Sequence, residues 1–118
     1  MNHKNLEVWN RSVTLIKKVY VSTSALPDSE RFGLTMQMRK AAISIISNIA
    51  EGAARGSDKV LVQFLYQSLS SAAELETQII ISKELEYISD VSELDALIQE
   101  IKQMLVGWIK YLKSKPTH

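Results

Sequence analysis

The sequence predicts an all-α protein: a single-domain, antiparallel up-and-down four-helix bundle that assembles into a homo-oligomer. Three observations support this prediction. The 118 residues suit one domain with its own hydrophobic core. Four glycines and two prolines are too few for the many turns of a β-sandwich or barrel. Apolar residues recur at helical spacing in four segments, at about residues 6–24, 34–54, 58–87 and 91–114.

The first segment has an apolar seam whose members are spaced alternately by three and four residues, which places them on one side of a helix. Pro27 ends this helical region, because the residue before a proline disfavours the helical conformation. Gly33 favours an irregular turn over residues 28–33. The predicted seam consists of Leu6, Trp9, Val13, Ile16 and Tyr20.

The second segment, 34–54, is apolar on nearly all sides, with Thr35 as its candidate N-cap. A helix that is apolar on most faces must be covered on most faces. Three partners in one small bundle leave part of it uncovered, so we expect a homo-oligomer with Ile43 and Ile46 in its interface. The alternative is that this helix is simply the most buried one of a monomer.

The third and fourth segments are bounded by capping residues. Gly56 and Ser57 close the second helix and open the third, as C′ and N-cap residues. Asp90 and Glu93 match a capping box for the fourth helix. Short links between consecutive helices make neighbours antiparallel. The seams are Leu61, Phe64 or Leu65, Ser68, Ala72, Leu75, Ile79, Ser82 and Glu86 in the third segment, and Leu94, Leu97 or Ile98, Ile101, Met104 or Leu105, Trp108 and Leu112 in the fourth.

The side-chain inventory argues against catalysis and against a cofactor. There is no cysteine, which excludes disulfides and thiolate metal sites. The only histidines are His3 and His118, at the chain ends, so no internal imidazole is available for a metal or for general-base work. No apolar run approaches the roughly 18 residues of a membrane span. We therefore expect a cytoplasmic, non-catalytic protein without cofactor, metal or membrane.

One polar group stands out at the end of the second segment. Asn48, Glu51 and Arg55 share one side of the helix, and Glu74 on the next helix is a candidate partner. We interpret these four residues as a polar clasp that fixes the register of the helices. The alternative is a small-molecule or nucleic-acid site at this end of the bundle.

The charges are unevenly distributed although the net charge is only +1. Residues 1–59 hold nine Lys and Arg against five Asp and Glu, whereas residues 60–118 hold five against eight. The basic half could give one positive face, or could serve contacts between helices or subunits. The candidate nucleic-acid contacts are Arg11, Lys17, Lys18, Arg39, Lys40, Arg55 and Lys59.

Several stretches resemble a known bacterial family. They are Leu6-Glu7-Val8-Trp9, Pro27-x-x-Glu30-x-x-Gly33-Leu34, Ser44-Ile45-x-x-Asn48-Ile49-Ala50-Glu51-Gly52-x-x-Arg55 and Ser71-Ala72-x-Glu74-Leu75-Glu76. The chain resembles, over nearly its whole length, the four-helix-bundle family encoded in intervening sequences of 23S rRNA genes. The resemblance implies a ring-like homopentamer. It extends to the accessory protein of diversity-generating retroelements, a basic pentamer thought to work with a reverse transcriptase. The net charge of +1 departs from that basic relative.

Three functional hypotheses follow from these features. The first is a non-catalytic homo-oligomeric helical scaffold that binds RNA or a nucleic-acid enzyme through a basic face. The second is a protein-protein adaptor without nucleic-acid binding, and the third is a small-molecule binder at the Asn48, Glu51 and Arg55 end.

Overall fold

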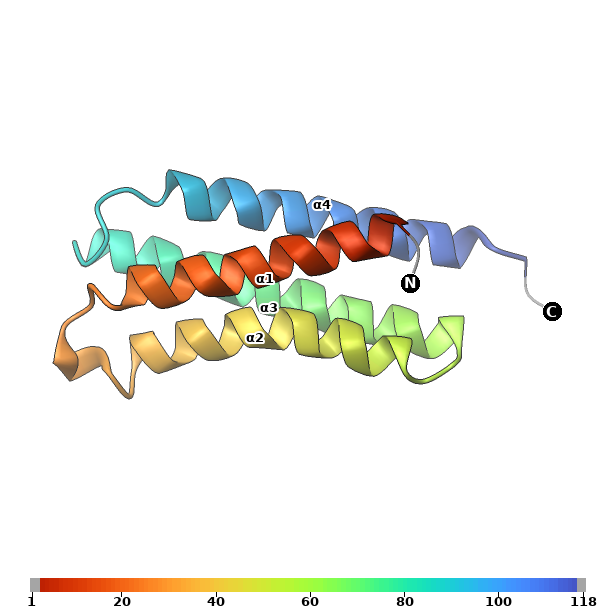
Figure 1. The fold of residues 1–118 in the computed structure, drawn as a ribbon, viewed down its shortest axis with the longest axis horizontal. Helices are drawn as coiled ribbons and strands as arrows, with labels where there is room; N and C mark the ends of the chain where they lie inside the picture. The colour runs from red at the N-terminus through yellow and green to blue at the C-terminus, as the bar shows by residue number, and fades with distance from the viewer. Residues whose placement is uncertain (1–2, 117–118) are drawn as a thin grey trace.

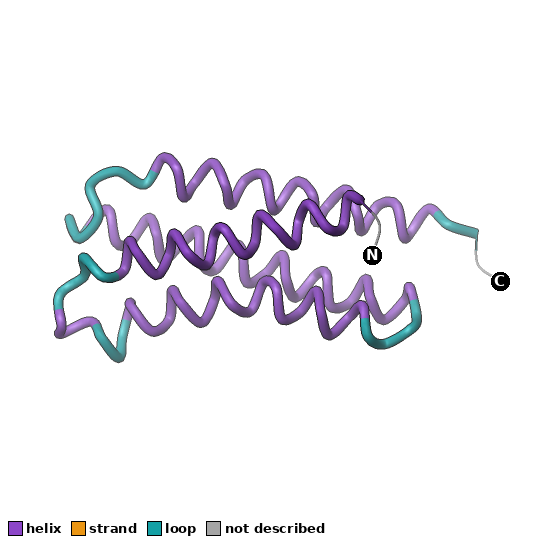
Figure 2. Tube along the Cα trace, in the orientation of Figure 1, coloured by secondary structure: helices purple, strands orange, loops and turns teal. Residues whose placement is uncertain are grey.

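The computed structural model describes residues 3–116 and confirms an all-helical single domain with four α-helices and, in this range, no strand. The helices are α1 (His3–Thr23), α2 (Leu34–Ala53), α3 (Asp58–Glu84) and α4 (Ser92–Ser114), with a short 3-10 helix η1 (Asp28–Glu30) between α1 and α2. Figure 1 shows them lying side by side along the longest axis of the molecule, and Figure 2 shows that the links alternate between its two ends.

The helices form a ring of four around one core in a molecule of 53 × 24 × 19 Å. α1 packs on α2 and α4, and α3 packs on the same two helices, so α1 and α3 lie diagonally opposite each other. Every helix contributes fully buried apolar side chains, among them Leu15, Ile45, Leu75 and Leu105. Burying apolar surface lowers the free energy of the folded state by about 25 cal/mol per Å². This core is therefore the main stabilising contribution to the fold.

The seam predicted for α1 is wrong by one position on the helix. The buried residues are Val8, Ser12, Leu15, Val19 and Thr23, whereas Leu6 and Tyr20 are exposed. Ser12 and Thr23 tolerate burial because their hydroxyls donate to the carbonyls of Val8 and Val19, at 2.8 and 2.7 Å. The true seam therefore contains two polar residues, and the apolar residues of the predicted seam lie on its flank.

The two predicted N-caps at Thr35 and Asp90 are wrong, and the one at Ser57 is confirmed. The Ser57 hydroxyl accepts from the Val60 amide, and Gly56 has a positive φ of 71°. α2 begins one residue before Thr35, after Gly33. The Asp90 carboxylate accepts from the Ser92 amide at 3.0 Å, but it precedes the cap position of α4.

Glu30 from η1 takes the role that Thr35 was predicted to play. Its Oε1 accepts from the Leu34 amide at 3.3 Å, and its Oε2 accepts from the Tyr87 hydroxyl at 3.0 Å. The hydrogen bond to Glu30 raises the pKa of Tyr87. One carboxylate thus joins the start of α2 to the α3–α4 link.

α3 ends at Glu84, three residues earlier than predicted. Glu86 adopts a left-handed conformation with φ 63°, which ends the helix. The Tyr87 amide donates to the Ser82 carbonyl and the Glu86 amide to the Lys83 carbonyl, both at 2.9 Å. This is a Schellman ending, a role usually filled by glycine, which explains why the sequence pattern did not reveal it.

Candidate assembly and binding surfaces

The predicted polar clasp is wrong as a group of four. Glu51 and Arg55 form an exposed ion pair, with Arg55 Nη2 2.6 Å from Glu51 Oε1. Asn48 instead donates to the carbonyl and the hydroxyl of Ser44, at 2.8 and 3.1 Å. Because its amide hydrogens are used within its own helix, Asn48 does not join the pair.

Glu74 is also separate from the Glu51–Arg55 pair. It is exposed on α3, and its Oε1 accepts from Gln78 Nε2 at 3.2 Å. The Arg55 guanidinium lies over the Phe64 ring, 5.2 Å from its centroid. The end of α2 therefore carries one exposed ion pair, which contributes little to stability, and not a four-residue site.

Three of the seven candidate nucleic-acid contacts are paired with carboxylates. Arg11 Nε donates to Glu100 at 3.0 Å, and this hydrogen bond raises the pKa of Arg11. Lys18 pairs with Glu93. Arg55 pairs with Glu51, as described above. These cations have local negative partners, which reduces their attraction for phosphate.

The other four candidates are divided between two environments. Arg39 is half-buried: its Nε donates to Thr23 Oγ1 at 2.9 Å, and its guanidinium lies 4.4 Å from the Tyr20 ring centroid. The remaining three, Lys17, Lys40 and Lys59, are exposed. The structure thus places six of the seven cations on three different helices and Arg55 in the turn after α2.

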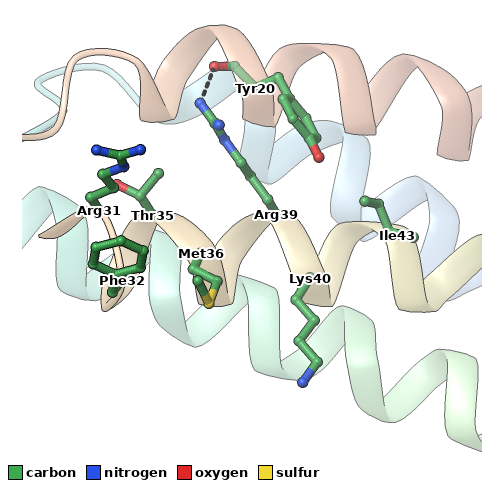
Figure 3. Close-up of a pocket in the computed structure, with 8 residues that line it drawn as sticks. All are labelled: Tyr20, Arg31, Phe32, Thr35, Met36, Arg39, Lys40 and Ile43. Atoms are coloured by element: carbon green, nitrogen blue, oxygen red, sulfur yellow. Dashed lines mark hydrogen bonds between the residues drawn. The ribbon is translucent and has the colours of Figure 1, made fainter.

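A groove of about 480 Å³ between α1 and α2 brings together Arg39, Lys40 and Ile43 of the predicted residues. Figure 3 shows Arg39 reaching from α2 to the Tyr20 carbonyl, while Lys40 points away from it. Phe32 at the rim is 74% exposed, and Met36 is 47% exposed. The groove, so named from here on, is lined by Tyr20, Arg31, Phe32, Thr35, Met36, Arg39, Lys40 and Ile43.

Five of the eight groove residues were not predicted as functional. Tyr20 was placed in the core seam and Thr35 at a helix cap, and no functional role was predicted for Arg31, Phe32 and Met36. A signal was present, because an exposed aromatic residue beside an arginine stands in the segment predicted to be an irregular turn. The Arg31 guanidinium lies 5.3 Å from the Phe32 ring centroid. Such a pair in a turn is typical of a contact surface.

A smaller hollow of about 260 Å³ lies between α1 and α4. It combines Lys17 and Lys18 with Asp90 and Glu93, so its charges are balanced. Hydrogen bonds from Ser92 lower the pKa of Asp90 and keep it ionised. The mixed charge makes this hollow a poor match for an anionic polymer.

The outward side of α2 remains uncovered along its whole length. Positions 36, 40, 43, 47, 50 and 54 are spaced alternately by four and three residues, and all are exposed. Only Lys40 among them is charged. Ile43, predicted in the interface, is 40% exposed, whereas Ile46, predicted with it, is half-buried. We call this the α2 stripe: Met36, Lys40, Ile43, Ser47, Ala50 and Ala54.

The described residues show neither a metal-binding cluster nor a membrane-spanning helix. No group of three or more His, Asp or Glu side chains is arranged to hold a metal ion in that part of the chain. Within the same range, no helix combines the length and the apolar character needed to cross a membrane. Of the two histidines considered in the sequence, His118 and the side chain of His3 lie outside what the structure describes.

The fold defines a class, that of small all-helical single-domain proteins with four helices. The sequence profile of the family described as 23S rRNA-intervening sequence protein matches residues 4–107. The chain therefore belongs to this family, and the resemblance seen in the sequence is confirmed to that extent.

A solved structure supports the same fold. It is the crystal structure, at 1.70 Å resolution, of a protein with unknown function from the S23 ribosomal protein family of Bacteroides thetaiotaomicron VPI-5482. The TM-score is 0.82 and the sequence identity is 23%, over 91% of this chain and 98% of that one. At this identity the similarity shows the fold alone. No curated protein matches the chain.

Proposed function

We propose that the chain, as an antiparallel up-and-down four-helix bundle, is the protomer of a non-catalytic, homo-oligomeric helical scaffold in the cytoplasm. The observation that supports this most directly is the α2 stripe. It presents apolar or small side chains to solvent over about five helical turns, interrupted by one lysine. Extended exposed apolar surfaces of this kind are typical of interaction sites.

The flanks of the stripe strengthen the proposal. Tyr20 and Phe32 beside it are exposed, so the apolar surface is wider than one helix. Small residues at positions 47, 50 and 54 allow another helix to approach closely. A second copy of the chain is always available as a partner, and most soluble oligomers are symmetric homo-oligomers. The family resemblance makes five copies the expected number.

Multi-angle light scattering tests the assembly. We expect a mass about five times the 13.3 kDa of one chain. Ile43→Glu should lower that mass while leaving the helical circular dichroism signal intact, because it places a charge in the proposed interface. Val106→Glu is the matched control, since Val106 on α4 is 37% exposed and lies off the stripe. A wild-type chain that remains monomeric at micromolar concentration contradicts the proposal.

Nucleic-acid binding is a second candidate function, and one observation favours it. The groove places Arg31, Arg39 and Lys40 beside the exposed ring of Phe32, a combination suited to phosphates and unstacked bases. The similarity to the retroelement accessory protein adds a nucleic-acid enzyme as a candidate partner. Filter retention of a structured RNA at 50 and 200 mM salt tests this function, and loss of retention already at 50 mM contradicts it.

The ion pairing of the other cations favours the scaffold over this second function. Arg11, Lys18 and Arg55 are already neutralised by carboxylates. The surfaces that carry these three cations therefore fit a protein-protein adaptor better than a nucleic-acid-binding protein. For the small-molecule alternative, Glu51 and Arg55 form only an exposed pair, and the groove lies elsewhere on α2.

A further inference from the structure

The groove has a complementary surface on the same chain. On α3, positions 77, 80 and 84 are spaced by three and four residues and share one exposed side of the helix. Ile80 and Ile81 are 56% and 42% exposed, and Glu84 beside them is also exposed. We call this surface the α3 patch: Thr77, Ile80, Ile81 and Glu84.

The two surfaces are opposite in charge and alike in apolar character. Three cations line the groove, and no carboxylate does. The α3 patch carries Glu84, and Glu86 follows at the end of the helix, also exposed. Lys83, which precedes Glu84, is exposed too, so these three side chains carry a net charge of −1 (two carboxylates and one ammonium group). An apolar centre with complementary charge at its rim is the pattern of a specific interface.

The two surfaces also lie at the same end of the molecule. The groove is at the end of α1 and the start of α2, and the α3 patch is near the end of α3 (Figure 1). Rotation about an axis parallel to the helices keeps both surfaces at the same height. The groove of one copy can therefore meet the α3 patch of the next copy in a ring.

The positions of the helices prevent one neighbour from covering both surfaces. α3 lies diagonally opposite α1, so its outward side faces away from the α1–α2 groove. A two-fold contact that paired the groove and the patch reciprocally would need both on one side of the bundle. The contact is therefore head-to-tail, which is the type that closes into rings.

We propose that the groove binds the α3 patch of a second copy of this chain, with Lys40 opposite Glu84, in a head-to-tail interface. This inference rests on the proposed homo-oligomer and specifies how its subunits meet. It also assigns the groove to a protein partner, so a nucleic acid is not its occupant.

Charge reversal tests the pairing. Lys40→Glu and Glu84→Lys should each weaken assembly by about tenfold in dissociation constant, since each places like charges together. The double variant should recover most of the loss. Lys110→Glu is the matched control, because Lys110 is an exposed lysine of α4 outside both surfaces, and its mass should equal that of the wild type.

Cross-linking tests the direction of the contact. The chain has no cysteine, so introduced thiols are the only ones present. The double variant Met36→Cys with Ile80→Cys, treated with a short bismaleimide, should give a ladder of covalent multimers. Each single variant should remain uncross-linked, because groove does not meet groove and patch does not meet patch.

The outcomes separate this inference from the proposed function. A monomeric wild type removes both. An oligomer whose mass and dissociation constant are unchanged in Lys40→Glu removes only the groove–patch pairing, and cross-linking of Met36→Cys alone does the same by showing a groove-to-groove contact. If Lys40→Glu lowers RNA retention without affecting assembly, the pairing is wrong and the groove belongs to the nucleic acid.

Discussion

The α2–α3 interface and the interfaces of α4 are held by different kinds of contact. Between α2 and α3 the polar contacts are short hydroxyl hydrogen bonds: Ser68 Oγ donates to the Ile45 carbonyl at 2.7 Å, and Ser44 and Ser71 are joined at 2.8 Å. The ion pairs between helices of the described residues all involve α4 or the lysine that follows it. They are Arg11–Glu100, Lys18–Glu93, Lys102–Glu76 and Lys115–Asp58.

This difference follows from side-chain size. Glycine, alanine and serine let α2 and α3 approach closely, so their register is fixed by steric fit and by buried hydrogen bonds with little freedom. Long charged side chains at the rim of α4 adapt to small shifts and are screened by solvent. We therefore expect the α2–α3 side to be sensitive to single substitutions and the α4 side to be tolerant.

Gly52→Val should have the largest effect. A Cβ at Gly52 would lie 2.7 Å from Phe64 Cβ and 3.0 Å from Leu61 Cδ1, so α2 and α3 must separate. We expect a loss of about 2–3 kcal/mol in the free energy of unfolding, typical of overpacking. Denaturant unfolding followed by circular dichroism measures it.

Gly107→Val is the control for that substitution. Gly107 lies within α4, and a Cβ there would have no neighbour within 4 Å. Because valine favours helix over glycine, stability should be unchanged or slightly higher. Equal losses at the two glycines would contradict the proposed steric sensitivity of the α2–α3 side.

Ser68→Ala should have the next largest effect. Ser68 is fully buried, and its hydroxyl donates to the Ile45 carbonyl across the interface. Loss of this hydrogen bond should cost about 1 kcal/mol. Ser70→Ala, on the exposed side of α3, should leave the unfolding midpoint unchanged or slightly raised, because alanine favours helix over serine. A loss of similar size there would contradict the assignment of the Ser68 effect to its buried hydrogen bond.

The periodicity predicted the existence of the helices well, because long amphipathic segments carry a strong signal. In α3, Leu75 and Ile79 of the predicted seam are buried, as are Ile98 and Leu105 in α4. The seam of α1 was misplaced because hydropathy alone treats Ser12 as a surface residue. Its hydrogen bond to the preceding turn becomes visible only in the folded helix.

The candidate site was harder to predict, because it depends on which helices become neighbours. The sequence placed Asn48 and Glu74 with Glu51 and Arg55, but local hydrogen bonds within α2 and α3 engage both residues instead. Arg39 and Lys40 were found because they are charged. Met36 was missed because an exposed apolar residue on a helix has no sequence signature that distinguishes it from a core residue. Phe32 was missed although its place beside Arg31 in a predicted turn was a usable signal.

The α3–α4 ion pair gives a pH-dependent prediction of smaller size. Hydrogen bonds from Gln99 and Lys102 lower the pKa of Glu76 below its ordinary value of 4.5. The carboxylate therefore stabilises the fold above about pH 4.5, and this contribution is lost as the pH falls through the lowered pKa.

In Glu76→Gln, the free energy of unfolding should accordingly fall less steeply as the pH is lowered from about pH 5 to about pH 3. Thermal unfolding across this range measures the change. Glu74→Gln, which removes an exposed carboxylate from the same helix outside the groove and the α3 patch, is the control and should keep the wild-type slope. The same flattening in both variants would mean that general charge, and not the contact with Gln99 and Lys102, governs acid stability.

The smallest effect is expected for the Lys18–Glu93 pair between α1 and α4. The Glu93 side chain is 76% exposed. A double-mutant cycle with Lys18→Met and Glu93→Gln should give a coupling of about 0.5 kcal/mol at low salt, the usual range for exposed pairs. It should fall towards zero in 1 M NaCl, where the screening length is about 3 Å. A coupling that persists at high salt and matches the Ser68 effect would mean that α4 is held as specifically as α3, and the contrast between the two sides of the bundle would disappear.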